Sequence, residues 1–495
     1  MPLHFASIFH VLGLILGCVS LSLLLPWSTA WLLNEPVAFR AFGLTLLSAL
    51  ALGAGLYFPF KARFSAYYLR HREACFIVTL AWVSIAGIGA LPYLFSGVFA
   101  TANASWLYQI SNSYFESVSG LTTTGSTILT NIEALPRSLL LWRSESQWLG
   151  GMGIILLTIA ILPLLGVGGM QLFKAEVPGV SVDKISPRIS ETAKTLWVLY
   201  LGLSLAEFAL LLLGKMSVYD ALCHTFTTLS TGGFSPKNLS IEHYNSRYIG
   251  AVITGFMFLG GVNFIVLYKL VQGRFKQSWR DLELRLYLMI TGLVVAMVAL
   301  NLWGQGVYQS LGQALRYSGF QVVSVMTTTG FSSANWEHWP VFSQALLVSL
   351  MFTGGMAGST SGGTKLVRLI ILLKYAYREL QTLIHPRAII SVKLQGQIIS
   401  REVIRSVLAF FTIFSLLLIM GTLSLTALNQ DLLTAFSACL TALSNVGPGL
   451  STIGAADNFN HLPLLAKWIL IALMLLGRLE IYTAFVLLMP AFWKK

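Results

Sequence analysis

Long apolar stretches alternate with short polar segments along the whole chain. Runs of about 20 apolar residues recur from 5–25 to 468–489, and each is long enough as a helix to cross roughly 30 Å of hydrocarbon. We count ten such stretches. Four further apolar segments, 106–118, 219–229, 311–325 and 432–443, have only about 11–15 residues and are too short to cross. The pattern predicts an all-α polytopic membrane protein whose four short helices enter the membrane and stop.

A short glycine-centred segment follows each of the four short helices. These segments read LTTTGST, LSTGGFS, MTTTGFS and LSNVGPG, and their glycines recur at intervals of roughly 100 residues. Farther along, LGGMG, LGGVN, TGGMA and LGRLE align as a second marker. We therefore predict four repeats of span, short helix, loop and span, preceded by a helix pair and a basic loop. The units are 1–73 for the helix pair and loop, then 74–193, 194–283, 284–402 and 403–495 for the repeats.

Four extended Thr/Gly loops around one axis could replace the water shell of a small cation with backbone carbonyls. Glycine permits the backbone angles that turn successive carbonyls to one side, and threonine adds a hydroxyl and a stiff side chain. A single TTTG segment is weak evidence, because Thr and Gly also let membrane helices pack closely. Four segments in register favour a selectivity filter. The expected ligands are Thr123, Thr124, Gly125, Thr231, Gly232, Gly233, Thr328, Thr329, Gly330, Asn445, Val446 and Gly447.

The segment TGGMAGSTSGGTK interrupts the second span of the third repeat. Its Gly, Ser and Thr residues make a poor helix, and non-helical backbone at membrane depth must line a watery cavity. We expect a loop that crosses the inner pore as a gate; the alternative is a close-packed helix interface. Lys365 and Arg368 at its inner end could link it to a cytoplasmic partner. The gate residues are Gly354, Gly355, Gly358, Ser359, Thr360, Ser361, Gly362, Gly363 and Lys365.

Arg478 lies in the middle of an apolar span, where a charge is costly unless it faces water or a partner. The other three repeats have glycine at the aligned position: Gly151, Gly261 and Gly355. Arg478 is therefore expected to protrude into the pore below the filter and act as a barrier to cations. The alternative is an internal salt bridge with Glu480 or another acid.

Charge and composition set the orientation and exclude some partners. The chain is 56% hydrophobic and 10% charged, which is typical of a membrane protein and not of a soluble domain. Lys and Arg gather in alternate loops, so the positive-inside rule predicts that both termini are cytoplasmic. The net charge of +13 thus reflects topology and not a nucleic-acid partner. Glu116, Asp220 and Asp431 could attract cations to the outer mouth or simply begin helices; His224 is expected to be a packing residue.

At these residues the chain resembles the Trk/Ktr/HKT superfamily of K⁺ transporters, and within it the TrkH-type membrane subunits of bacterial Trk potassium uptake systems. The four loops, the broken helix and Arg478 carry the resemblance, and the extra N-terminal helix pair is similar to Trk and not to Ktr. Some relatives have serine at the first filter glycine and conduct Na⁺, so Gly125 indicates K⁺. The fourth segment, SNVGPG, departs from the threonine pattern, which leaves its ligands open.

The resemblance implies K⁺ uptake or symport through a multi-pass protein of the bacterial cell inner membrane, with K⁺ as the bound and transported ion. It implies a homodimer and a cytoplasmic, NAD(H)- or ATP-binding, TrkA-like regulatory subunit, so this chain would carry no organic cofactor. An alternative is a secondary transporter that couples Na⁺ or H⁺ to another solute; such folds often use inverted repeats, whereas these repeats run in one direction. A scaffold or an enzyme is disfavoured, because no catalytic groups cluster. The coupling ion and the nucleotide stay open.

Overall fold

The structure is a computed structural model that describes residues 3–62, 64, 71–100, 105–153, 189–388, 390–394 and 397–494. These residues form helices joined by loops, with one two-stranded antiparallel hairpin, β1 (Lys393–Leu394) and β2 (Gln397–Ile398). The all-α polytopic class predicted from the sequence is confirmed. The part of the first repeat's second span predicted at 154–173 lies outside the described residues.

A leading group of helices precedes those that fall within the four repeats predicted from the sequence. The leading group consists of α1 (Phe5–Ser20), α2 (Leu24–Leu32) and α3 (Pro36–Lys61). The first two repeats contain α4 (His71–Phe95), α5 (Trp106–Leu121), α6 (Arg137–Gly151), α9 (Ile189–Leu213), α10 (Val218–Leu229), α11 (Arg247–Gly260), α12 (Phe264–Val271) and α13 (Phe275–Trp279). The last two contain α14 (Leu282–Gly304), α15 (Leu311–Met326), α16 (Val341–Met351), α17 (Leu366–Ile384), α18 (Arg401–Ala427), α19 (Leu432–Ser444), α20 (Leu464–Arg478), α21 (Tyr482–Phe485) and α22 (Pro490–Trp493).

Six of the described helical segments are long and apolar enough to cross a membrane, and two bent pairs bring the number to eight. The bent pairs are α11 with α12 and α20 with α21, which turn by 112° and 114°. The remaining two of the ten predicted crossings correspond to α6, whose continuation is not described, and to α16 and α17. The 14 residues between α16 and α17 are not helical, as the Gly/Ser/Thr-rich sequence predicts.

The four short helices α5, α10, α15 and α19 begin in the same way. The residue before each helix is a serine or an aspartate whose side chain accepts a hydrogen bond from the backbone N–H three residues later. Such caps satisfy donors that the first helical turn leaves free. The capping residues are Ser105, Ser217, Ser310 and Asp431. Each helix thus has a defined start and stops after three or four turns at its glycine loop.

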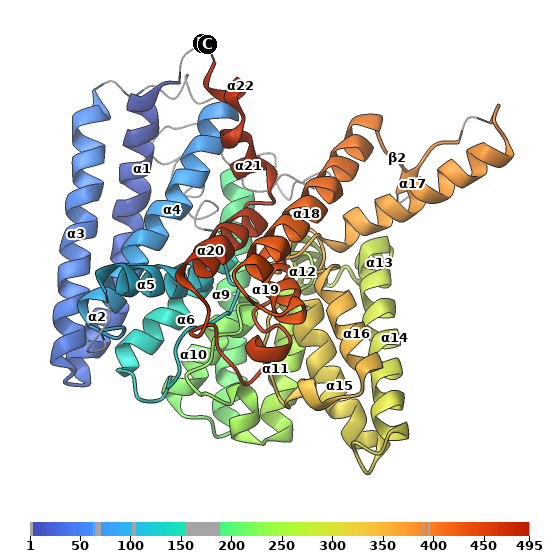
Figure 1. Ribbon diagram of the computed structural model, residues 1–495, viewed down its shortest axis with the longest axis horizontal. Helices are drawn as coiled ribbons and strands as arrows, with labels where there is room; N and C mark the ends of the chain where they lie inside the picture. The colour runs from blue at the N-terminus through green and yellow to red at the C-terminus, as the bar shows by residue number, and fades with distance from the viewer. Residues whose placement is uncertain are drawn as a thin grey trace.

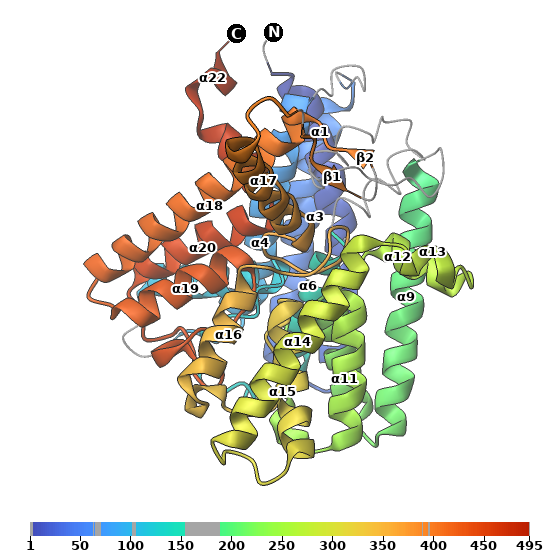
Figure 2. The ribbon, with the colours of Figure 1, turned by 90° about the vertical axis from the view of Figure 1, so that its right-hand side faces the viewer.

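The repeats surround the centre of the molecule, and α1 and α3 pack together at its edge (Figure 1). The start of α1 and the last helix α22 lie at the same end of the molecule (Figure 2). We call this end the gate side and the opposite end, toward which the glycine loops lead, the filter side. Helix α17 projects outward on the gate side (Figure 1).

Candidate functional site

The four glycine loops share one backbone conformation. In each loop the glycine has a positive φ: 84° at Gly125, 77° at Gly233, 81° at Gly330 and 105° at Gly447. The residue two positions earlier is also left-handed, with φ of 52° to 57°, although it is not glycine. These residues are Thr123, Thr231, Thr328 and Asn445. Residues other than glycine rarely adopt a positive φ. The same two positive-φ positions in all four loops therefore indicate one repeated geometry imposed by the surrounding fold.

The loops close a ring. A Cβ atom placed on each glycine would lie less than 3.0 Å from a backbone carbonyl oxygen of the next loop. Gly125 faces Gly232, Gly233 faces Thr329, Gly330 faces Val446, and Gly447 faces Thr124 of the first loop. The Ser126 hydroxyl also donates to the Gly447 carbonyl at 3.0 Å, which joins the first and fourth loops. The order one, two, three, four and back to one requires that the loops surround a common axis.

The backbone donors of the loops are directed away from this ring. The residue before each glycine donates its N–H to the carbonyl five residues earlier, in the last turn of the short helix, at 2.8–3.0 Å. These donors are Thr124, Gly232, Thr329 and Val446, the same residues whose carbonyls meet the neighbouring glycines. With N–H groups satisfied behind the ring, the arrangement presents oxygen atoms toward the neighbouring loops and the axis.

Two loops receive support from helix α6. Gln147 donates its amide to the Gly232 carbonyl at 2.7 Å and accepts from the Phe234 N–H at 3.0 Å. Arg143 forms an ion pair of 2.6 Å with Glu116 of α5 and donates to the Ser235 carbonyl at 2.9 Å. Glu116 also accepts the Ile128 N–H at 3.0 Å. The pair therefore ties the segment after the first loop to the segment after the second.

Breaking this buried pair should destabilise the protein. Both side chains are at most 3% exposed, so Arg143→Gln leaves the Glu116 carboxylate buried without its cation, at a cost of about 3–5 kcal/mol. Thermal unfolding of the detergent-purified variant measures the loss. The double variant Glu116→Gln/Arg143→Gln should recover part of it. Equal stability of the wild type and the single variant would show that the pair does not hold the loops.

The fourth loop replaces a threonine with Asn445, and the structure gives this residue a different role. Its amide nitrogen donates to the Thr124 hydroxyl at 2.9 Å and to the Met474 carbonyl at 3.0 Å. Asn445 thus connects the fourth loop to the first loop and to α20. The departure in sequence therefore leaves the ring geometry intact.

The glycines of the second aligned marker (LGGMG, LGGVN, TGGMA and LGRLE) let the second span of three repeats pack closely against its short helix. A Cβ on Gly150 or Gly477 would collide with the carbonyl of Leu121 or Leu443, and one on Gly260 would lie 3.1 Å from that of Leu229. Each of these leucines precedes the glycine of its ring loop by four residues. Gly354 is the exception, because its span has become a loop and its neighbour is Gly362 of that same loop.

This loop between α16 and α17 lies directly beneath the ring. The Gly362 N–H donates to the Thr328 hydroxyl at 2.7 Å, and the Thr360 hydroxyl donates to the carbonyls of Leu229 and Gly260 at 2.9 and 3.0 Å. The Leu366 N–H meets the Gly355 carbonyl at 3.0 Å, so the two ends of the loop are adjacent. The loop between α16 and α17 therefore reaches the second and third glycine loops.

Glu283 and Asn263, which the sequence analysis did not single out, hold the gate-side part of this loop. One oxygen of Glu283 accepts the N–H groups of Ala357 and Val367 at 2.9 and 3.1 Å. The Asn263 amide donates to the Ala357 carbonyl at 2.7 Å. In the sequence, Glu283 stands out only as a carboxylate at the start of an apolar helix. Acids are common at helix starts, so this feature alone does not identify Glu283 as a residue that holds the loop.

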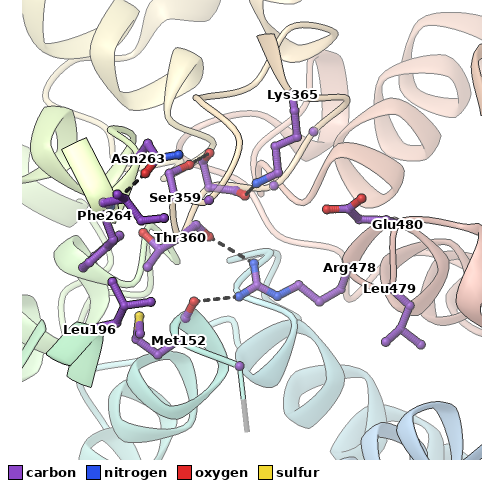
Figure 3. A pocket seen from close by; sticks show the side chains of 18 of the residues that line it. Met152, Leu196, Asn263, Phe264, Ser359, Thr360, Lys365, Arg478, Leu479 and Glu480 are labelled. Atoms are coloured by element: carbon purple, nitrogen blue, oxygen red, sulfur yellow. Dashed lines mark hydrogen bonds between the residues drawn. The ribbon is translucent and has the colours of Figure 1, made fainter. Parts of the chain in front are cut away.

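Arg478 extends from the last turn of α20 to this loop (Figure 3). Its guanidinium donates to the carbonyls of Thr360 and Gly151 at 3.1 Å each and also to that of Gly150. A cavity of about 150 Å³ lies here, lined by Arg478, Met152 and residues 358–363 of the loop. Glu480 forms its ion pair with Arg368, so the salt bridge considered between Glu480 and Arg478 is replaced by contacts with backbone carbonyls.

Some expectations are wrong. Lys365 and Arg368 are less than 10% exposed, and Lys365 donates to the Ser361 carbonyl within the loop, so they are not placed to contact a partner. Glu116 is fully buried in its ion pair and does not attract cations at the mouth. Asp431 begins α19, and the Thr434 hydrogen bonds lower the pKa of its carboxyl, which supports the helix-start interpretation.

On the filter side, a cavity of about 110 Å³ is lined by all four ring glycines and by Asp457. Asp457 follows the fourth loop and was also not singled out from the sequence. The ring therefore has a polar cavity above it, and below it a loop that the half-buried Arg478 contacts. Within the described ranges, no group of three His, Cys, Asp or Glu side chains could hold a metal ion.

Comparisons with known proteins agree over the full length. The family model for TrkH cation transport proteins matches residues 39–495. The chain is 41% identical to the Trk system potassium uptake protein TrkH of Escherichia coli K12 over 100% of both chains, and 34% identical to TrkG of the same organism over 99% of each. The crystal structure of the potassium transporter TrkH from Vibrio parahaemolyticus matches with a TM-score of 0.86 at 36% identity, covering 99% of this chain and 100% of that chain.

Proposed function

Because the chain belongs to the TrkH family of cation transport proteins, we propose that it takes up K⁺ through the ring of four loops. The named relatives are potassium uptake proteins of Trk systems. The observation that carries the proposal is the closed ring, in which each glycine faces a carbonyl of the next loop. Carbonyls held in this way can replace the hydration shell of K⁺.

The filter ligands are the twelve residues expected from the sequence, with the carbonyls before each glycine at the centre. The Thr123 hydroxyl is fully buried and has no hydrogen-bond partner among the described residues, which suits an additional oxygen ligand. The Gly232 carbonyl already accepts the Gln147 amide, so the second loop contributes one partly engaged oxygen. The aligned C-terminal ends of the four short helices add negative potential toward the ring.

The loop 354–365 is the gate in this proposal, and Arg478 holds it shut. The contacts of Gly362 with Thr328 and of Arg478 with Thr360 keep the loop against the inner end of the filter. A cation that leaves the filter would meet the loop and a fixed positive charge. Movement of the loop toward the gate side would open the path, and Glu283, which holds its ends, would act as the fixed point.

The remaining assignments follow the family. The gate side faces the cytoplasm, both termini lie there, and the membrane is the bacterial inner membrane. A cytoplasmic nucleotide-binding subunit moves the gate, and the functional unit is a homodimer. For the dimer, support comes from α17, which projects outward and exposes Leu380, Leu383 and Ile384 to 60%, 78% and 71%. The five units predicted from the sequence are retained as the domain division.

Flux of ⁸⁶Rb⁺ and ²²Na⁺ into proteoliposomes of the purified chain tests the function. We expect Rb⁺ uptake that K⁺ competes with, and Na⁺ uptake at least about tenfold lower, the ratio that a 1.4 kcal/mol difference produces. Empty liposomes are the control. Uptake of an organic solute with no Rb⁺ flux would instead support the secondary-transporter alternative.

Removing the Arg478 side chain should increase flux without unfolding the protein. Arg478→Ala removes the bonds to Thr360 and Gly151, and the aligned glycines show that the fold accepts small residues at this position. We expect Rb⁺ flux to rise several-fold, and Arg478→Lys to retain most of the restriction, because its charge remains. A large fall in thermal stability with no gain in flux would show that Arg478 is structural.

A further inference from the structure

A groove with a volume of about 1,050 Å³ lies between α11 and α15 on the filter side, away from the ion path. The two helices pack side by side (Figure 2). The groove exceeds the roughly 300–1,000 Å³ of ordinary ligand pockets. Leu315, which lines it, is 43% exposed, as is typical of a side chain that faces hydrocarbon. In a bilayer such a space is filled by lipid or by another chain, since water is excluded from an apolar surface.

Glycines make the groove wide. Gly250 and Gly255 of α11 and Gly319 of α15 line it, and a Cβ atom added to any of them would meet nothing within 4 Å. Phe320 and Val323 form part of its apolar wall. In helices that pack tightly, glycine allows close contact; here it leaves open space instead. The part of the groove formed by these three glycines, its floor, can therefore accept an extended hydrocarbon chain.

Two arginines line the groove. Arg247 is the first residue of α11, and Arg316 lies in the second turn of α15 with its guanidinium 5.2 Å from the Tyr317 ring. Across the described residues, neither guanidinium has an ion pair or a hydrogen bond. Glu242 also lines the groove, so the three side chains together leave one net positive charge. The Ser333 hydroxyl lines it as well and lacks a partner within the described part of the chain.

Two tyrosines indicate how deep in the bilayer the polar cluster of Arg247, Arg316, Glu242 and Ser333 lies. Tyr308 and Tyr317 stack with their ring centroids 4.8 Å apart and planes within 9°, and both line the groove. Tyrosines and arginines gather where a protein meets the headgroup region of a bilayer. The polar cluster therefore lies at headgroup level, with the apolar floor next to it.

We propose that this groove binds one anionic glycerophospholipid of the leaflet on the filter side. Arg247 and Arg316 donate to its phosphate, the Ser333 hydroxyl donates to an ester or headgroup oxygen, and one acyl chain lies along the three glycines. Planar guanidinium groups suit phosphate oxygens, and one net positive charge matches a headgroup with a single negative charge. The lipid would join the second repeat to the third at the outer end of α15, which leads to the third filter loop.

Native mass spectrometry of the purified chain, titrated with phosphatidylglycerol, tests the site. We expect Arg247→Gln/Arg316→Gln and Gly255→Leu each to weaken binding of the first lipid about tenfold, because one loses the charged donors and the other fills the floor. Arg40→Gln on α3 and Gly202→Leu on α9 are matched controls, since Arg40 is exposed at the filter-side start of α3 and a Cβ on Gly202 meets open space. Both controls should bind like the wild type, and phosphatidylcholine should bind less tightly than phosphatidylglycerol.

Other outcomes overturn the proposal. If phosphatidylglycerol binding were weakened equally in the control variants, the lipid would adsorb to the charged surface in general and not to this groove. Unchanged phosphatidylglycerol binding in Gly255→Leu, together with conversion of dimers to monomers, would assign the groove to a second copy of the chain. Unchanged binding in both groove variants, with wild-type thermal stability, would show that no phospholipid site exists there.

Discussion

Shortening the loop beneath the filter should produce a protein that conducts K⁺ without its regulator. A variant that lacks 358–362 removes the segment that contacts Thr328 and Arg478, while the Gly355 carbonyl and the Leu366 N–H already meet at 3.0 Å. The chain can therefore be rejoined without moving α16 or α17. If the loop keeps the open state at a tenth of the population or less, basal Rb⁺ flux should rise about tenfold.

The control for this deletion keeps the loop length. Ser359→Ala removes the hydroxyl contacts with the Met356 carbonyl at 2.6 Å and with the Ser361 hydroxyl at 2.7 Å, both within the loop, and should conduct like the wild type. Flux is measured in proteoliposomes with and without the cytoplasmic subunit, and thermal stability in detergent shows whether the protein is folded. A stable deletion variant with unchanged flux and unchanged regulation would establish the loop as a packing surface.

A serine at a filter glycine should abolish most discrimination between K⁺ and Na⁺. Gly330 has a φ of 81°, and its Cβ would collide with the Val446 carbonyl. The side chain must therefore displace that carbonyl or alter its own backbone, at about 1–2 kcal/mol for the left-handed conformation alone. Because 1.4 kcal/mol is a factor of ten, we expect the Rb⁺/Na⁺ flux ratio to fall about tenfold or more. Gly125→Ser, against the Gly232 carbonyl, should act in the same direction.

The matched control is Gly312→Ser on α15, the short helix that precedes the loop of Gly330. A Cβ on Gly312 meets nothing within 4 Å, so the substitution should leave both stability and selectivity unchanged. Dual-isotope flux of ⁸⁶Rb⁺ and ²²Na⁺ measures the ratio. An unaltered ratio in both Gly330→Ser and Gly125→Ser, with normal protein yield, would remove the basis for assigning these loops as the filter.

Features that depend on local sequence were predictable. The four short helices, the broken helix of the third repeat and the aligned glycines each follow from residues close together in the chain. The glycine at 330 could be aligned with those at 125, 233 and 447 because each follows a truncated apolar helix. Backbone conformation at a glycine loop is a local property, so the loops could be recognised before their arrangement was known.

Features that depend on contacts between repeats were not predictable. The ion pair of Glu116 could not be predicted, because its partner Arg143 is 27 positions away on another helix. Gln147 and Glu283 had no motif around them, and their roles come from carbonyls and N–H groups brought near by the fold. The same is true of Arg478, whose position was marked by repeat alignment but whose backbone partners lie in two other repeats.

Anomalous diffraction from crystals grown in Rb⁺ tests the central claim most directly, because it locates the ion itself. We predict a peak on the axis of the ring, between the carbonyls of Thr124, Gly232, Thr329 and Val446, that weakens when K⁺ is added and is absent from crystals of Gly330→Ser. Strong anomalous peaks elsewhere in the molecule and none within the ring, in protein that transports Rb⁺, would contradict the filter.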